Sequence, residues 1–434
     1  MDIQRAMVKK NIVILGAGFG GIACAMKLEK LFQKKRALFK DFAIALIDKR
    51  NYHLYTPALY DVATTAVDDA SPLNIKKAVA TPTEEIIEHS RIKFVQGHVV
   101  GANITEKKIL FSDETALHYE YLVLALGSEM AHFGIPGVKE HSISLKWLDD
   151  AIHIRATIRR KYEEKAHDSQ LSMVVGGGGP TGVEFAAELL GYIRKLNLKS
   201  GRAVRPIITV VEGAPTILPG FDAWTTRTAT KRLTALGIFL KTGCLVSRAD
   251  EKAVFIKSSS DTVTEEQLPY DVFIWSGGVQ AVNIFSAGQV AQEKRGKMET
   301  DAYMTCLSPD KHLDVARNIF AIGDNACFYD PRTHRSPAAT ARLAIEQGKV
   351  AAENVFRDIL GSPRKVFKIW RYPYVIPIGG KYAVGKIGPF KIEGLLAWVF
   401  HELVELYYLW SITNDNWKAL KRWWRGLEIF SKND

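Results

Sequence analysis

Cysteine is scarce in this sequence, and its four copies are widely separated. They are Cys24, Cys244, Cys306 and Cys327, and no two of them form a Cys-x-x-Cys pair. This spacing argues against a zinc ribbon or an adjacent redox disulfide, and it fits a reducing compartment. The sequence has no HExxH motif or other metal-ligand spacing, so we expect no metal site.

Long uncharged apolar runs are missing as well. No stretch of about 18 or more residues is free of charge, which argues against an ordinary membrane-spanning helix. The first ten residues hold no apolar core of signal-peptide length. Helix-turn-helix and RNA-recognition patterns are also absent, so nucleic acid binding is not expected. The net charge of +11 nevertheless predicts an anionic partner.

The composition is that of a folded protein with more than one domain. Of the 434 residues, 47% are hydrophobic and 24% are charged, which excludes a disordered chain, a collagen and a disulfide scaffold. The length exceeds what one hydrophobic core usually supports, so we expect two or three domains.

One supersecondary pattern occurs twice, about 160 residues apart. In the first copy, the buried strand 11–15 leads into GAGFGG, a helix over 22–32 and a second strand, 42–47. In the second copy, the strand 172–175 leads into GGGGPTG, a helix and the strand 206–211. Each copy is a βαβ unit, so we predict an α/β fold with two Rossmann-like dinucleotide-binding domains.

The first glycine loop has the spacing of a phosphate-binding turn. Gly16 permits the tight turn, Gly18 lets a pyrophosphate approach the backbone, and Gly21 lets helix and strand pack closely. Asp48, at the end of the next strand, can accept hydrogen bonds from a ribose diol. It stands farther from Gly16 than the usual ~20 residues, and we attribute the excess to an insertion at 33–41.

The second glycine loop repeats this chemistry with Gly177, Gly179 and Gly182, and Glu212 repeats the acid. A carboxylate here favours a free 2′-hydroxyl, and the next residue is Gly213 rather than an arginine, so NADH is favoured over NADPH. The alternative is that Glu212 is a strand-end acid in solvent. Two nucleotide sites in one chain imply electron transfer between a flavin and a nicotinamide.

The end of the sequence changes character. Between residues 364 and 391 there are seven basic residues and no acid. We predict a mostly apolar helix over 394–412, whose polar members form one narrow strip, and an amphipathic helix over 417–427. The strip consists of His401, Glu402 and Glu405. On the second helix, Lys418, Lys421, Arg422 and Arg425 share one face, and Trp417, Leu420, Trp424 and Leu427 share the other.

Helices of this kind lie in the surface of a membrane, and we therefore predict a C-terminal membrane-anchoring module. The alternative is that the first helix packs on the protein's own body or on a second subunit.

Five segments together resemble the type II NADH:quinone oxidoreductases, which are single-chain flavoproteins with two dinucleotide-binding domains. The segments are GAGFGG, LIDKRNYHLYTPALYDVAT, VVGGGGPTGVEFAAEL, VFIWSGGV and NIFAIGDNA, and the similarity runs from about Asn11 to Trp424. The resemblance implies FAD in the first unit and NADH in the second. It also implies transfer of two electrons from NADH through FAD to a membrane quinone, without proton pumping.

The resemblance also implies roles for single residues. Asp324 would bind the ribitol or phosphate region of the flavin, and Thr56 and Pro57 would lie near the isoalloxazine. Glu184 would lie beside the nicotinamide and flavin, although a first-turn acid also simply suits a helix dipole. The residues expected to contact FAD or NADH are Gly16, Gly18, Phe19, Gly20, Gly21, Asp48, Lys49, Thr56, Pro57, Ala125, Gly127, Gly177, Gly179, Pro180, Thr181, Gly182, Glu212, Gly277, Gly323 and Asp324.

One departure from the family concerns the helix after the IGD motif. Two glutamines usually stand there in a pattern like AQxAxQ, whereas Arg342 and Glu346 take these positions in this sequence. As i,i+4 neighbours they could form an ordinary surface ion pair. Alternatively, Arg342 could stabilise an anionic reduced flavin or a quinone oxygen. With Glu184, these two residues are the candidate catalytic residues.

The predicted domains are an FAD-binding domain in two parts, 1–140 and 286–363, an NADH-binding domain, 141–285, and the C-terminal module, 364–434. We expect a peripheral membrane protein that faces a reducing compartment, on the cytoplasmic side of the inner membrane if the source is bacterial. A homodimer is left open.

Three alternative functions remain at this point. A sulfide:quinone oxidoreductase-like enzyme would rely on cysteines near the flavin. A soluble NADH-dependent flavin reductase would serve another acceptor, such as a protein. A flavoprotein that binds NADH could instead act as a redox sensor.

Overall fold

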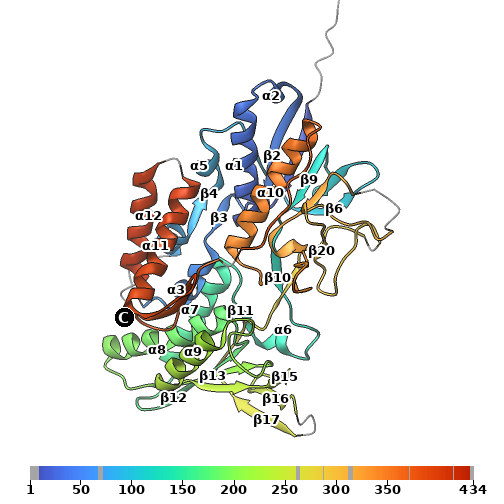
Figure 1. Ribbon diagram of the computed structural model, residues 1–434. Coiled ribbons are helices and arrows are strands. Elements are labelled where there is room, and N and C mark those ends of the chain that lie inside the picture. The colour runs from blue at the N-terminus through green and yellow to red at the C-terminus, as the bar shows by residue number, and fades with distance from the viewer. Residues whose placement is uncertain are drawn as a thin grey trace, which may run out of the picture. The chain divides into compact units, whose positions relative to one another are not determined.

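The computed structural model describes residues 9–66, 72–260, 264–286, 288–310, 316–370, 372–413 and 415–430 (Figure 1). The chain divides into two compact units, each assembled from three segments. The first unit comprises Met1–His53, Thr81–Glu129 and Val279–Trp370, and the second comprises Leu54–Ala80, Met130–Gly278 and Arg371–Asp434.

A parallel sheet forms the centre of the first unit. Its strand order is β21 (Ile319–Ala321), β9 (Tyr121–Leu124), β1 (Lys10–Leu15), β2 (Phe42–Asp48) and β5 (Lys93–Gln96). Residues 12–15 of β1 are completely buried, because both faces of a parallel sheet are covered. The insertion predicted at 33–41 contains the short helix α2 (Leu38–Asp41), which leads directly into β2.

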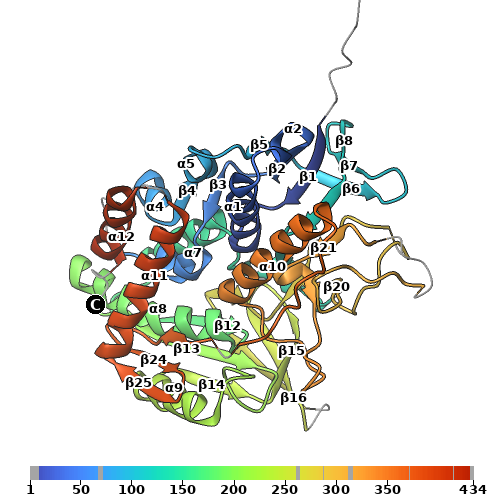
Figure 2. The ribbon, with the colours of Figure 1, turned by 45° about the horizontal axis from the view of Figure 1, so that its top comes forward.

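Helix α1 (Phe19–Lys34) and helix α10 (Ala341–Ile359) lie side by side in this unit, although they are more than 300 residues apart in sequence (Figures 1 and 2). Glycines allow the close approach. A Cβ atom on Gly348 would lie 2.4 Å from the Gly20 carbonyl oxygen, and one on Gly20 would lie 3.1 Å from the Ala344 carbonyl oxygen. The two helices therefore meet backbone to backbone.

Smaller elements complete the first unit. An antiparallel sheet contains β6 (Val99–Asn103), β7 (Lys108–Phe111) and β8 (Ala116–His118). The remaining elements are α5 (Thr83–Ile87), the pair β20 (Met298–Glu299) and β22 (Ala326–Cys327), and the 3-10 turn η2 (Gly323–Asn325). Strand β19 (Val279–Ala281) pairs with β10 (Ser128–Met130), and β4 (Ala80–Pro82) pairs with β3 (Tyr52–Leu54).

The second unit repeats the plan of the first. Its parallel sheet has the order β11 (Ile143–Ser144), β18 (Val272–Trp275), β12 (Gln170–Gly176), β13 (Arg205–Glu212) and β14 (Phe239–Thr242). The α/β fold class predicted from the duplicated βαβ pattern is confirmed. The helices are η1 (Thr56–Ala58), α3 (Leu59–Thr64), α4 (Pro72–Val79), α6 (Val138–His141), α7 (Leu148–Glu163), α8 (Pro180–Ser200) and α9 (Ala223–Ala235). An antiparallel sheet adds β15 (Cys244–Ala249), β16 (Ala253–Ser258) and β17 (Glu265–Pro269).

The C-terminal segment belongs to the second unit. It begins with an antiparallel sheet of β23 (Tyr374–Pro377), β24 (Ala383–Ile387) and β25 (Phe390–Gly394). Helices α11 (Leu395–Ile412) and α12 (Asn416–Phe430) follow and lie side by side, close to the two predicted ranges (Figures 1 and 2). Of the helices described, none combines the length and apolarity needed to cross a membrane.

Gly348→Ala should destabilise the first unit, because the new methyl carbon would clash with the Gly20 carbonyl oxygen. Overpacking typically costs about 1–3 kcal/mol, so we expect a lower midpoint in chemical denaturation. Gly101→Ala is the matched control, because its nearest neighbour atom would lie at 3.6 Å, an ordinary contact. Equal midpoints for the two variants would contradict the close packing of α1 against α10.

Candidate functional site

The first glycine loop connects the end of β1 to the start of α1. Gly16 has a φ of +105°, and a Cβ atom there would lie 2.1 Å from the Ala125 carbonyl oxygen. A Cβ on Gly21 would lie 1.8 Å from the Gly16 carbonyl oxygen. Gly18 is different, because no described atom beyond its chain neighbours would lie within 4 Å of its Cβ. Packing thus requires glycine at two positions, and the third borders open space that a phosphate could approach.

Asp48 fastens this loop to the end of β2. One carboxylate oxygen accepts a hydrogen bond from the Ala17 N–H at 2.7 Å, and the other accepts one from the Arg50 N–H at 2.8 Å. The predicted ribose acceptor therefore also fixes the backbone of the turn. Lys49 is exposed, and its carbonyl oxygen accepts a hydrogen bond from Gln96.

A second turn lies at the same edge of the sheet, at the carboxyl ends of β9 and β21. Gly323 has a φ of +62°, and the Ser128 hydroxyl donates a hydrogen bond to the Asp324 carboxylate. The buried Asn325 accepts a hydrogen bond from the Gly127 N–H at 2.7 Å. The structure thus joins residues that the sequence separates by almost 200 positions, at the edge where α/β sheets bind ligands.

Four other predicted contact residues have different surroundings. The Phe19 ring packs edge-on against His53, with ring centroids 4.9 Å apart. Gly20 faces α10, so its close contact is with a helix. Thr56 and Pro57 lie in η1, which belongs to the second unit, and their predicted place near the isoalloxazine stays a prediction.

The second glycine loop, between β12 and α8, has the same geometry. Gly177 has a φ of +114°, and its Cβ would lie 2.6 Å from the Ser276 backbone; one on Gly182 would lie 1.9 Å from the Gly177 carbonyl oxygen. The position of Gly179 is again open among the described atoms. Gly277 follows Ser276, so its backbone also approaches Gly177.

Glu212 holds this second loop as Asp48 holds the first. Its two carboxylate oxygens accept hydrogen bonds from the Gly178 and Ala214 N–H groups, both at 2.7 Å. Pro180 is the first residue of α8, and both Pro180 and Thr181 are exposed beside the open loop position. The duplication seen in the sequence is therefore also a duplication of hydrogen bonds.

Glu184 lies beyond the first turn of α8, so a first-turn role in the helix dipole does not apply. Burial, and then the neighbouring Glu188, raise the pKa of the Glu184 carboxyl well above its usual value. A carboxyl with a raised pKa keeps its proton to a higher pH than an exposed glutamate does, which suits donation of a hydrogen bond or of a proton.

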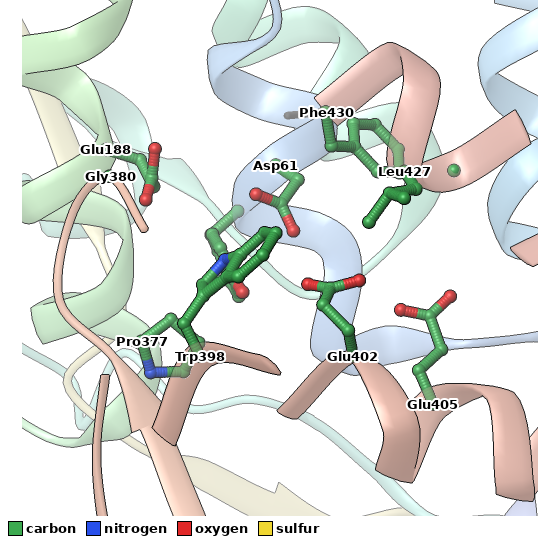
Figure 3. Close-up of a pocket in the computed structure, with 11 residues that line it drawn as sticks. Asp61, Glu188, Pro377, Gly380, Trp398, Glu402, Glu405, Leu427 and Phe430 are labelled. Atoms are coloured by element: carbon green, nitrogen blue, oxygen red, sulfur yellow. The ribbon is translucent and has the colours of Figure 1, made fainter. Parts of the chain in front are cut away.

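An acidic pocket opens near Glu188 within the second unit. We define it by four carboxyl groups, those of Asp61 on α3, Glu188 on α8, and Glu402 and Glu405 on α11 (Figure 3). Burial, followed by the charges of Glu188, Glu402 and Glu405, raises the pKa of Asp61 well above its usual value. Burial and Glu402 raise the pKa of Glu405 to about 8. Within the described part of the chain, no group of His, Cys, Asp and Glu side chains could hold a metal ion.

Sequence reasoning did not identify this pocket. The available signal was the pair of glutamates on the otherwise apolar helix α11, and Asp61 inside the segment ALYDVAT. Trp398 of α11 and Phe430 of α12 also line the pocket, as Figure 3 shows.

Arg342 and Glu346, the two predicted catalytic residues on α10, form an ion pair. The Arg342 guanidinium lies 3.1 Å from a Glu346 carboxylate oxygen, and Lys349 lies 3.0 Å from the same oxygen. The next residue, Gln347, is buried, and its side-chain oxygen accepts a hydrogen bond from the Gly323 N–H at 2.7 Å. Sequence reasoning considered the two charged neighbours and missed this buried amide.

Helix α11 has an inverted distribution of polarity for a surface helix. Its polar strip, His401, Glu402 and Glu405, is largely buried, whereas large apolar side chains are exposed. The exposed set is Leu395, Leu396, Val399, Leu403, Val404, Tyr407 and Trp410. On α12, Trp417 and Trp424 are exposed, while Leu420 and Leu427 are partly buried, so the predicted apolar face is divided.

Two dinucleotide-binding sheets, each with a glycine loop held by a strand-end acid, define an oxidoreductase of the two-domain nucleotide-binding class. Residues 10–348 match the family model described as pyridine nucleotide-disulphide oxidoreductase, and the chain belongs to this family.

Similar proteins with known names point in the same direction. The type II NADH:quinone oxidoreductase Ndh of Mycobacterium tuberculosis is 27% identical over 92% of this chain and 84% of its own. A Staphylococcus aureus protein named type II NADH:quinone oxidoreductase is 28% identical over 94% and 97%. These names confirm the family resemblance predicted from the sequence motifs.

Solved structures show the same fold. NDH2 from Plasmodium falciparum, solved in complex with NADH, aligns with a TM-score of 0.78 at 19% identity and covers 98% of this chain and 99% of its own. The sulfide:quinone oxidoreductase of Aquifex aeolicus aligns with a TM-score of 0.74 at 19% identity, over 93% and 92%.

Glu405→Gln should change how stability depends on pH. In the folded state the pKa of Glu405 is raised to about 8, so the folded protein binds this proton more tightly than the unfolded chain does. The resulting stability is fully present below the unfolded pKa and is lost as the pH rises towards about 8. We expect the melting temperature of the wild type to fall from pH 5 to pH 8, and the variant to lose part of that fall. Glu251→Gln, at an exposed turn, is the control and should follow the wild type. Parallel curves for all three proteins would show that folding does not raise the pKa of Glu405.

Proposed function

We propose that this protein oxidises NADH and passes two electrons through FAD to a membrane quinone, as a peripheral membrane enzyme that pumps no protons. The observation that carries this proposal is the duplicated glycine loop, each copy with one open position and a strand-end carboxylate bonded to the loop backbone. The two named type II NADH:quinone oxidoreductases support it over most of their length.

We assign FAD to the first unit. The loop N–H groups at Gly18 and the N-terminus of α1 would hold its phosphates, Asp48 its ribose, and Asp324 its ribitol or phosphate region. The glycine geometry supports this assignment. Of Gly16, Gly18 and Gly21, only Gly18 has open space beside it for a bound group. Bound FAD would accept a hydride equivalent and release electrons to an acceptor.

We assign NADH to the second unit, on equivalent grounds. Gly179 marks the open position of the loop, and the N-terminus of α8 would face the pyrophosphate. Glu212 would accept a hydrogen bond from the ribose 2′-hydroxyl and repel a 2′-phosphate, so NADH is the substrate rather than NADPH. Glu184, which is partly buried and has a raised pKa, is proposed to donate a hydrogen bond or a proton near the nicotinamide.

The acceptor side of the proposal rests on α10. In the structure the Arg342 guanidinium pairs with Glu346 at 3.1 Å, and the Arg342 side chain is exposed. We propose that the pair replaces the two glutamines found in similar enzymes and that Arg342 donates hydrogen bonds to a quinone oxygen. A planar guanidinium has five donors and is suited to this task.

Attachment to a membrane surface is proposed for α11 and α12. Exposed large apolar residues of α11 and the exposed Trp417 and Trp424 of α12 would enter the interfacial layer, and the basic residues of α12 would meet anionic headgroups. Contact with a bilayer would also bring a lipid-soluble quinone to the enzyme. We propose the cytoplasmic side of the inner membrane as the location if the source is bacterial.

Two of the four cysteines argue against the sulfide:quinone alternative. Cys24 and Cys306 are buried, and burial raises the pKa of both thiols, for Cys24 to about 12. Cys327 is also buried. Burial therefore opposes the thiolate form of Cys24 and Cys306, and the thiolate is the reactive form of a cysteine.

Two glycine variants test the assignment of the two loops. Gly18→Ala and Gly179→Ala meet no described atom within 4 Å, so both variants should fold. We expect Gly18→Ala to be purified with little FAD. We expect Gly179→Ala to keep its FAD while needing at least about tenfold more NADH for half-maximal rate, a loss of about 1.4 kcal/mol.

The assay is steady-state oxidation of NADH with a short-chain quinone, together with anaerobic bleaching of the flavin by NADH. NADPH should be a much poorer donor for the wild type. A colourless wild-type protein after addition of FAD, or a rate that does not depend on quinone, would contradict the proposed function.

Trp417→Gln/Trp424→Gln should reduce binding to liposomes that contain anionic lipid, because two interfacial anchors are lost. Trp370→Gln is the matched control, since Trp370 is as exposed as Trp417, at 70%, but lies in the first unit. Liposome flotation measures the bound fraction, and turnover with a water-soluble quinone should stay unchanged in all variants. Equal flotation of the double variant and the control would contradict the proposed anchoring by Trp417 and Trp424.

A further inference from the structure

A buried histidine contacts the backbone of the first glycine loop. The His53 side chain is 1% exposed, and its Nδ1 atom lies 3.0 Å from the Ala17 carbonyl oxygen. Because a carbonyl oxygen can only accept, Nδ1 must carry the proton in this contact. The N–H of the same residue, Ala17, donates to Asp48 at 2.7 Å. Both polar groups of Ala17, the residue that precedes Gly18, are therefore held by side chains.

Phe19 supports this arrangement. Its ring meets the imidazole of His53 edge-on, at an interplanar angle of 88°. The aromatic contact restricts rotation of the imidazole about its χ2 angle, so Nδ1 stays directed at the loop. This gives the predicted contact residue Phe19 an indirect role.

Gln347 has an equivalent place at the second turn. Its side chain is 1% exposed, and its oxygen accepts the Gly323 N–H at 2.7 Å. Gly323 adopts a φ of +62°, which starts the turn that carries Asp324. Helix α10 thus holds this turn by a side-chain amide, in the same way that His53 holds the glycine loop.

We propose that His53 and Gln347 are positioning residues for FAD, and that each sets one of the two backbone turns between which the cofactor binds. The inference rests on the proposed FAD site of the first unit. Neither residue belongs to the glycine motif or to the IGD motif, and each acts through a backbone group.

The physical reason is that a phosphate site made of backbone N–H groups depends on the direction of those groups. Loss of His53 would leave the Ala17 carbonyl oxygen without this donor, and loss of Gln347 would leave the Gly323 N–H without this acceptor. A buried polar group without a partner favours a change in the turn. Binding sites lose function when donors move by as little as about 0.5 Å.

The test compares apolar variants with variants that restore the hydrogen bond. His53→Leu and Gln347→Leu remove it, whereas His53→Asn keeps a donor near the Nδ1 position and Gln347→Glu keeps an acceptor. Asn354→Leu is the matched control, because Asn354 is a fully buried amide on the same helix that donates to the Tyr303 and Lys365 carbonyl oxygens.

Three quantities are measured on the purified holoenzyme: the rate of FAD release, the visible absorption spectrum of the flavin, and the melting temperature. We expect FAD release to be at least about tenfold faster in each Leu variant, with a shifted flavin spectrum, and both effects to be partly reversed in the restoring variants. Asn354→Leu should lower the melting temperature and leave FAD release and the spectrum unchanged.

If the Leu variants at 53 and 347 behave like Asn354→Leu, the two residues are only structural and the inference is wrong. If the restoring variants are no better than the Leu variants, the hydrogen bonds are not the cause and it is equally wrong. A wild type that binds no FAD would instead contradict the proposed function.

Discussion

The hydrogen bonds between a strand-end carboxylate and a glycine loop are the interaction on which both nucleotide-binding units depend. Asp48 accepts from the Ala17 N–H, and Glu212 accepts from the Gly178 N–H, each at 2.7 Å. Such bonds to an ionised acceptor are stronger than neutral ones. They hold each loop at the carboxyl edge of its sheet, so that the helix N-terminus is open to an anion. A residue without a side-chain acceptor at either position would leave the loop without this anchor.

Glycine has two different uses in these loops. At Gly16 and Gly177 the backbone has a positive φ and lies against a neighbouring strand end, so any side chain would clash. At Gly18 and Gly179 the surroundings are open, and close approach of the proposed ligand would account for glycine there. The same principle extends to α10, where Gly348 permits the contact that brings Gln347 to the turn at Gly323. Packing of a distant helix is thereby coupled to the shape of the proposed cofactor site.

In helix α11 the polar strip faces inward and many apolar side chains face outward, the reverse of an ordinary surface helix. In a water-facing helix the carboxylates of α11 would be outside, yet Glu402 and Glu405 line the acidic pocket and Leu395, Leu396 and Leu403 are exposed. Burial of several carboxyl groups together is tolerated because protons replace charge, as the raised pKa values of Asp61 and Glu405 indicate. The outward apolar surface is the physical basis for the proposed membrane contact.

The sequence by itself determined the local elements: two βαβ units, the glycine positions, the two strand-end acids and two C-terminal helices. These follow from periodicity and from the backbone freedom of glycine, which act over a few residues. Contacts between remote segments were decided only by the tertiary structure. No periodic pattern in the sequence predicts these contacts. Examples are the hydrogen bond between Gly127 and Asn325, the buried side chain of Gln347 on the same helix as the exposed Arg342, and the shared pocket of Asp61 and Glu402. They arise because folding of the sheets and packing of the helices bring side chains that are far apart in sequence into one small volume. There, burial and hydrogen bonding, rather than local conformational preference, decide the orientation and protonation of each side chain.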